Sequence, residues 1–258
     1  MEFNFREILE HHILDHVLLP LFTIGPIHFN LTLHLLMMWI SAAFLILLFL
    51  FANMGSGRSA GKLKLLMETL ILFIRDDVVV PALGERGKAY LHYFLTLFFF
   101  ILTCNLLGLV PGAATATGNI AVTATLALCT FFLIHIAGVR EQGFVHYVKG
   151  IVPSGLPAWL IPLMFPIELI GFLTKTFALS IRLFMNMIAG HIVVLAFLGL
   201  IFIFSAMNHW IGWGTAPISV VMALFIHFLE LVIVAPLQAF IFTFLTALFV
   251  GAAVHPEH

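Results

Sequence analysis

Two stretches of this chain, residues 157–207 and 215–254, are apolar almost throughout. A bilayer core about 30 Å thick is crossed by about 20 apolar residues in a helix. Each stretch is far longer than a helix perpendicular to the membrane requires, so long and strongly tilted helices are the simplest arrangement. Over all 258 residues, 62% are hydrophobic and only 9% are charged, which is too little charge to cover a water-soluble domain. The sequence therefore predicts an integral membrane protein.

The apolar runs and their interruptions predict an all-α fold with five membrane spans and one amphipathic helix at the interface. Residues 1–30 are expected to lie outside the membrane, and residues 31–258 to form a single membrane domain. The predicted spans are 31–52, 90–110, 119–138, 160–207 and 215–254, and the interfacial helix covers 62–82. The last two spans are predicted to form a long tilted hairpin that turns at residues 207–215, and residues 139–156 to form a loop.

The basic residues outside the spans predict the orientation of the chain. Eight of them fall in two loop regions that five spans would put on the same side: Arg58, Lys62, Lys64, Arg75, Arg86, Lys88, Arg140 and Lys149. On the other side Arg6 stands among acidic residues. The excess of Lys and Arg in cytoplasmic loops places the N-terminus outside and the C-terminus inside. The net charge of −1 offers no basic arm for nucleic acid.

Three weaker features of the sequence could indicate a cofactor or metal site, and none is interpreted as one. Cys104 and Cys129 lie inside apolar runs and are interpreted as small hydrophobic residues. The segment GSGRSAGK lacks the ending of a phosphate-binding loop. His11, His12 and His16 have a spacing that could hold zinc on a helix face, but a surface cluster is the preferred reading. No metal site is therefore predicted.

Two cations fall inside the predicted fourth span, where charge is expensive. An Arg at the centre of a membrane helix costs about 2.5–3.5 kcal/mol on insertion scales, and such residues usually mark ion paths. Glu168, Lys175 and Arg182 are spaced by seven residues and Asn186 follows four later, so helical periodicity places all four on one stripe. The structural alternative is a snorkelling Lys with an ion pair buried between helices.

Folding the last two spans into a hairpin brings polar residues to matching depths. Arg182 is expected to lie level with Gln238, and His191 level with Glu230, about 13 Å nearer the outside at 1.5 Å per residue. His and Glu exchange protons readily, whereas Arg stays protonated. A fixed cation between two proton-accessible paths would stop protons from crossing directly and would attract a carboxylate on a moving partner.

The stretches TKTFALSIRLFMNMIAGH (174–191) and LQAFIFTFLTALFV (237–250) resemble subunit a of the F0 sector of bacterial F-type ATP synthases. TCNLLGLVPG (103–112), TGNIAVTATLAL (117–128) and PAWLIPLMFPIELI (157–170) support the resemblance, which covers the chain from about residue 90 onward. It implies a non-catalytic membrane subunit with two aqueous half-channels leading to a rotating c-ring. The implied partners are that ring, the peripheral-stalk subunit b, the soluble F1 sector indirectly, and the lipid of the plasma (inner) membrane.

The resemblance also implies roles by position. Arg182 resembles the essential arginine facing the ring, with Asn186 one turn outward and Gln238 opposite. His191 and Glu230 resemble the His/Glu pair of the outer half-channel, and Glu168 resembles the acidic residue of the inner one. Asn105 resembles a polar residue that lines the outer access path. Lys175 is included as a further polar group near the arginine.

Two positions depart from the family pattern. Glu230 lies eight residues before Gln238, where the family usually has seven, and a bulge or kink near Pro236 could absorb the difference. Gly108 stands where some members have an acidic residue.

The alternatives to this reading are a secondary ion-coupled transporter and an intramembrane hydrolase. The first would predict internal repeats, and the second a nucleophile with its base or a zinc motif; the sequence offers neither. The coupling ion is left open between H⁺ and Na⁺, with H⁺ as the default.

Overall fold

The computed structural model describes residues 17–24, 27–54, 58–110, 113–151, 157 and 159–254, and these are mostly helical. Five helices are long and apolar enough to cross a membrane: 33–54, 91–108, 120–142, 161–207 and 209–254. The predicted all-α fold with five spans is confirmed. The chain divides into two compact units, and most of the long helices contribute residues to both.

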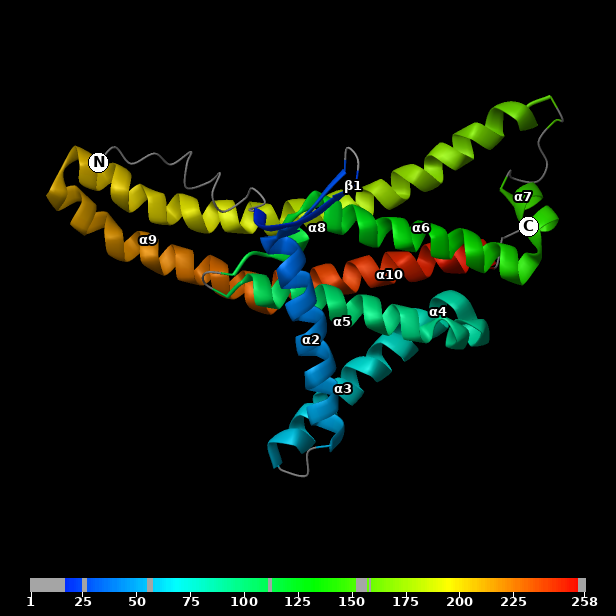
Figure 1. The fold of residues 1–258 in the computed structure, drawn as a ribbon, viewed down its shortest axis with the longest axis horizontal. Helices are drawn as coiled ribbons and strands as arrows, with labels where there is room; N and C mark the ends of the chain where they lie inside the picture. Colours follow the sequence, from blue (N-terminus) through cyan, green and yellow to red (C-terminus); the bar gives the residue numbers. More distant parts are fainter. Residues whose placement is uncertain are drawn as a thin grey trace. The chain divides into compact units, whose positions relative to one another are not determined.

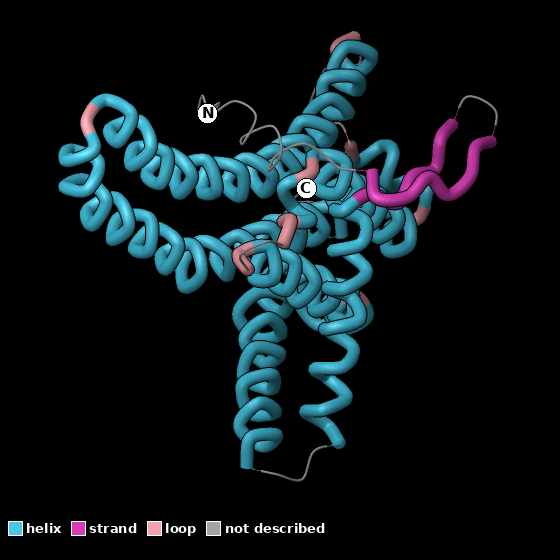
Figure 2. Tube along the Cα trace, turned by 60° about the vertical axis from the view of Figure 1, so that its left-hand side comes forward, coloured by secondary structure: helices cyan, strands magenta, loops and turns pink. Residues whose placement is uncertain are grey.

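The first unit takes residues up to 44, 101–122 and 183–238. It contains two antiparallel strands, β1 (Val17–Ile24) and β2 (Ile27–Thr32), which form the hairpin drawn in magenta in Figure 2. The sequence analysis did not predict these strands. Helix α2 (Leu33–Met54) follows β2 directly, and its residues to Phe44 belong to this unit.

The second half of α8 (Ile161–Met207) and helix α9 (His209–Leu229) form the long hairpin of the first unit. They run side by side in both Figure 1 and Figure 2. The turn was expected over residues 207–215, and the structure corrects this because α9 already begins at His209. Asn208 alone breaks the helix: its backbone is extended and its side chain accepts a hydrogen bond from the Trp210 backbone N–H at 3.0 Å, as a helix N-cap does.

Helix α9 continues without a break into a π-helical turn, η4 (Glu230–Val234), and then into α10 (Ala235–Val254). In η4 the backbone N–H of Ala235 bonds to the carbonyl of Glu230, five residues back. Pro236 explains its position, because proline has no N–H for the carbonyl four residues earlier and its ring crowds that carbonyl. A π turn takes one more residue per turn than an α turn, so η4 is the irregularity expected near Pro236.

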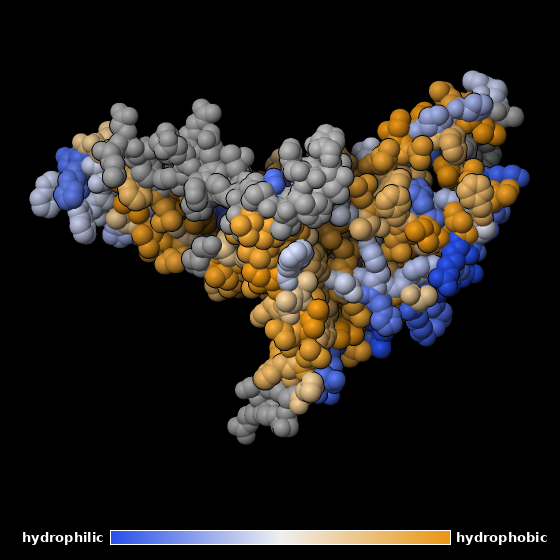
Figure 3. Space-filling view, viewed as in Figure 1, coloured by the Kyte–Doolittle hydropathy of each residue, from blue (hydrophilic) through white to orange (hydrophobic). Residues whose placement is uncertain are grey.

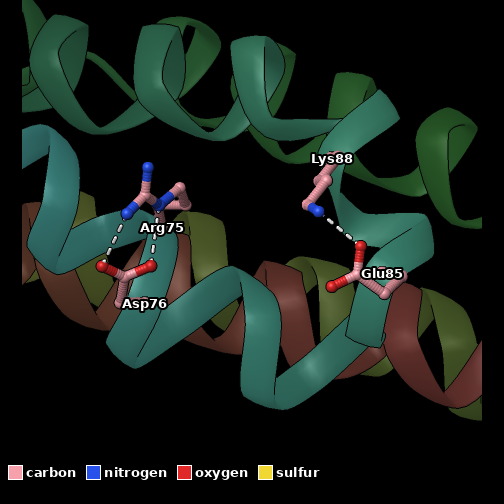
Figure 4. A network of polar contacts seen from close by, with 4 residues as sticks. All are labelled: Arg75, Asp76, Glu85 and Lys88. Atoms are coloured by element: carbon pink, nitrogen blue, oxygen red, sulfur yellow. Dashed lines mark hydrogen bonds and ion pairs between the residues drawn. The ribbon is translucent and has the colours of Figure 1, made fainter.

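The second unit takes residues 45–100, 123–182 and the chain from 239 on. Its α3 (Arg58–Phe73), π turn η1 (Ile74–Val79), α4 (Val80–Leu83) and 3-10 helix η2 (Gly84–Ala89) follow one another directly. Figure 4 shows two ion pairs there, Arg75 with Asp76 and Lys88 with Glu85. The hydrogen bonds from the Arg75 guanidinium lower the pKa of the Asp76 carboxyl. Polar contacts of this kind suit a segment at a membrane surface.

The second unit also holds residues 91–100 of α5 (Leu91–Gly108), residues 123–142 of α6 (Ile120–Gln142), and α7 (Phe144–Gly150). Residues 139–156 were expected to be a loop, but α6 runs on to Gln142 and α7 follows after Gly143. Gly143 has φ +81°, a conformation that favours glycine and allows the chain to reverse. Tyr147 of α7 packs against Gly138, where an added Cβ would lie 2.2 Å from its ring.

The exposed surfaces of the long helices are apolar, as a lipid-facing surface requires. Leu47 on α2 and Leu163 on α8 are 64% and 60% exposed. In Figure 3 orange side chains cover these helices, while blue side chains gather around η2. Charged side chains are therefore few on the exposed surfaces of the long helices.

Candidate functional site

A cavity of about 420 Å³ lies in the first unit between α2, α8, α9 and the segment that connects α5 to α6. Most of its lining is apolar, including Val194 and Leu195 of α8 and Ala223 of α9. The titratable side chains among the lining residues are those of His34, His191 and His227. A space of this size holds on the order of ten water molecules, and three imidazoles give that water proton-exchanging partners.

Glu230 is packed against the backbone of α8 beside His191. A Cβ atom added to Gly190 would lie 1.3 Å from Glu230 Oε1, so only glycine leaves room for the carboxyl group here. Glu230 is 5% exposed, and within the described part of the chain neither of its carboxyl oxygens has a hydrogen-bond partner. His227 Nδ1 lies 3.9 Å from Glu230 Oε2. A carboxyl group that lacks a hydrogen-bond partner among the described residues is suited to bond water or a mobile proton.

His191 has a hydrogen-bonding partner that the sequence did not reveal. Its Nε2 lies 2.6 Å from the hydroxyl of Thr115, in the segment between α5 and α6. Thr115 is 5% exposed. It packs so closely on Gly108 that a Cβ there would lie 2.2 Å from Thr115 Oγ1. The lack of a side chain at Gly108 therefore has a steric reason in this chain.

Asn105 is fully buried and joins this segment to the start of α10. The Thr117 hydroxyl donates to Asn105 Oδ1 at 2.7 Å, and Asn105 Nδ2 donates to the carbonyl of Ala235 at 3.3 Å. The partner of Asn105 on the helical side is thus the first residue after the π turn η4. Asn105 fixes the base of the segment that carries Thr115.

The first half of α8, in the second unit, carries the other predicted charged residues. Lys175 is exposed, and its ammonium lies 5.3 Å from the ring centre of Phe172 and 5.8 Å from that of Phe249. These are cation–π contacts, which stabilise an ammonium in an apolar setting. Glu168 is half-buried one to two turns earlier. Arg182, the last residue of this stretch of the second unit, is exposed, and no ion pair of the described residues includes it.

Comparison with known proteins decides the family. A family profile described as "ATP synthase A chain" matches residues 35–251. A protein named ATP synthase subunit a from Chloroherpeton thalassium is 44% identical over 265 residues, covering 96% of this chain and 77% of the relative. A second from Myxococcus xanthus is 44% identical over 240 residues, covering 91% and 76%. The chain belongs to the ATP synthase A chain family. The family resemblance expected from the sequence is thereby confirmed.

In this ATP synthase A chain family member, the structure brings some of the predicted site residues together. Glu230 lies against Gly190, next to His191, as the hairpin predicted. Asn105 belongs to the same unit and forms hydrogen bonds with Thr117 and with the Ala235 carbonyl. Asn186 is half-buried on α8 and Gln238 is 7% exposed on α10. The pairing of Arg182 with Gln238 stays a prediction, because these two residues belong to different units.

Sequence reasoning missed three residues of this site: His34, Thr115 and Gly190. Threonine in a connecting segment carries no signal of its own, since Thr115 and Thr117 look alike in the string PGAATATG. Gly190 was quoted within a motif but given no role, although a glycine inside a membrane helix often marks a close approach of another group. Histidines 11, 12 and 16 lie outside the described residues. Among the described residues no group of three or more His, Cys, Asp or Glu could hold a metal ion.

Proposed function

We propose that this chain is the proton-conducting subunit of an ATP synthase membrane sector, with two aqueous half-channels that lead to a ring of c subunits. The observation that carries the proposal is the exposed Arg182 in the middle of a 47-residue apolar helix. Left against lipid, an Arg at such a depth costs about 2.5–3.5 kcal/mol or more. A partner inside the membrane that offers a carboxylate to Arg182 removes that cost.

The exposed side of α8 around Arg182 fits a partner that slides past it. Ala178, Met185 and Ala189 are exposed with Arg182, at the three- and four-residue spacing of one helix face. The small side chains leave room for another helix to approach closely. A carboxylate on a ring subunit would be attracted to Arg182 and lose its proton there, and Gln238 and Asn186 would add neutral hydrogen-bonding groups.

The cavity of the first unit supplies the outer half-channel in this proposal. Protons from outside would enter the cavity, exchange with His191, His227 and Glu230, and pass to the ring carboxylate. Asn105 would hold the wall of the path. The permanent charge of Arg182, about 13 Å along α8 from His191, would keep protons from passing straight through.

The inner half-channel would follow the first half of α8. Glu168 lies 14 residues before Arg182, about 21 Å along the helix, and would receive the proton released from the ring on the inner side. Lys175 lies between them in the sequence. Its contacts with two aromatic rings would hold its positive charge where it changes the electrostatic potential along that path. ATP chemistry would take place in the F1 sector on other subunits.

The proposed setting is the bacterial plasma membrane, with the N-terminus outside and the C-terminus in the cytoplasm, as the distribution of Lys and Arg predicts. Peripheral-stalk subunit b would hold the chain still while the c-ring turns, and H⁺ is the proposed coupling ion.

Labelling of two neighbouring valines tests the outer path. Val194 lines the cavity, whereas Val193 is 40% exposed and does not. With Cys104 and Cys129 replaced by Ser, a cysteine at Val194 is expected to react with a membrane-impermeant methanethiosulfonate added to the outside. One at Val193 is expected to react at least tenfold more slowly, because a thiol ionises and reacts in water but not in lipid.

The labelled Val194→Cys complex should also lose ATP-driven proton pumping, measured by acridine-dye quenching in membrane vesicles. Equal, slow labelling at both positions would mean that water does not reach the cavity, and the outer half-channel would have to be sought elsewhere.

A further inference from the structure

The segment that connects α5 to α6 places the Thr115 hydroxyl against His191. Further contacts hold Thr115 in this position. The Thr115 Oγ1 to His191 Nε2 distance is 2.6 Å, and Thr115 is 5% exposed. Two other buried threonines, Thr243 and Thr246, return their hydroxyls to a carbonyl of their own helix. Thr115 instead reaches 76 residues along the chain.

The backbone around Thr115 is fixed from both ends of the segment. Gly118 N–H donates to the Thr115 carbonyl at 2.9 Å, and Ala113 N–H donates to the Val110 carbonyl at 2.9 Å. The bond from Thr117 to Asn105 pins the same turn to α5. A Cβ at Gly108 would meet three Thr115 atoms within 2.5 Å, so α5 supports the side chain from behind. The fixed backbone and the contact with Gly108 keep the Thr115 hydroxyl in one place.

A hydroxyl suits a histidine that changes its protonation state. It can donate to an unprotonated ring nitrogen. After its O–H bond rotates away, the same oxygen can accept from the N–H of an imidazolium. A carbonyl could serve only the protonated nitrogen. Thr115 therefore satisfies His191 Nε2 in both states, and the ring need not turn when a proton arrives or leaves.

We propose that Thr115 is a positioning residue of the outer half-channel, which keeps the His191 ring facing the cavity through both halves of each proton transfer. This inference rests on the proposed function above. Three other titratable groups face the same space or its edge: His34 from α2, His227 from α9, and Glu230 from η4, which lies 3.9 Å from His227. The Thr115 hydroxyl lies 2.6 Å from His191 Nε2.

The test measures passive proton conductance of inverted vesicles from which the F1 sector has been stripped, with the pH of the lumen varied from 5.5 to 8.5. Thr115→Val removes the hydroxyl and keeps the shape. We expect conductance about tenfold lower per assembled complex, because the hydrogen bond between Thr115 and the His191 ring is lost, and a shifted pH profile. Thr115→Ser should restore both within about twofold. Thr246→Val, an equally buried change, should leave both unaltered.

Two further variants separate this inference from the proposed function. If His191→Ala conducts like the parent, the outer path itself fails. If His191→Ala is impaired and Thr115→Val is normal, only the role of Thr115 fails. When both are impaired, adding Thr115→Val to His191→Ala should cause no further loss, because Thr115 acts only through the His191 ring. An additive loss, or an unshifted pH profile without rescue by Ser, would reduce Thr115 to a packing residue and overturn the inference.

Discussion

Replacing Arg182 by alanine is expected to abolish ATP-driven proton pumping in inverted vesicles, to below about 1% of the parent rate, while the complex still assembles. The side chain is exposed on α8 and takes part in no ion pair among the described residues, so its loss breaks no ion pair there. Without the fixed charge, a ring carboxylate is no longer driven to release its proton there. Protons that cross between the half-channels without rotation should appear as a passive leak after the F1 sector is removed.

Lys175→Ala is the matched control, because it also removes an exposed cation from the same helix. It gives up two cation–π contacts, each worth about 0.5–1 kcal/mol at an exposed site, and should retain most of the pumping. Normal pumping in assembled Arg182→Ala complexes would leave the arginine a structural charge and contradict the proposed mechanism. Comparable losses in both variants would point to a general need for positive charge on α8.

Replacing Glu230 by glutamine is expected to lower proton pumping about 100-fold, the lower end of what a positioned proton-transfer group contributes. Glutamine keeps the size of the side chain, so it fits the space beside Gly190, where a Cβ would lie 1.3 Å from the carboxyl oxygen. It cannot take up or release a proton. The loss should therefore appear in pumping and in passive conductance, and not in the amount of assembled complex.

The control for Glu230→Gln is the same chemical change at Glu141, which pairs with Arg86 at 3.6 Å at the end of α6. That partly exposed pair contributes about 1 kcal/mol and lies far along α6 from the cavity lining, so Glu141→Gln should pump normally. A Glu230→Gln complex that conducts protons like the parent would show that the buried carboxyl only fills space. The outer path would then run through His191 and His227 alone.

The span-forming helices of this fold follow from the sequence because the membrane makes their requirements simple. A run such as 160–207 must be helical to satisfy its backbone in lipid, and α8 covers Ile161–Met207. Arg182 was found for the same reason: a charge is conspicuous where every neighbour is apolar. The nearness of His191 and Glu230 followed from counting residues back from a turn.

What the sequence could not predict depends on contacts between distant residues. The turn was placed over residues 207–215, yet a single capping asparagine suffices. Strands β1 and β2 lie in a short mixed segment without clear alternation. Thr115 and Gly190 matter only through what packs on them, which no local pattern records.

The π turn at Glu230–Val234 has a consequence for how such a chain can change over generations. In an α-helix, one inserted residue rotates everything beyond it by about 100°, which would carry Gln238 to another side of α10. The wide turn takes up the extra residue locally, at the cost of weaker backbone geometry. A chain with one residue fewer between Glu230 and Gln238 could close this turn into an ordinary α turn and leave both ends where they are. The segment 231–234 can thus gain or lose one residue while Glu230 and Gln238 keep their neighbours.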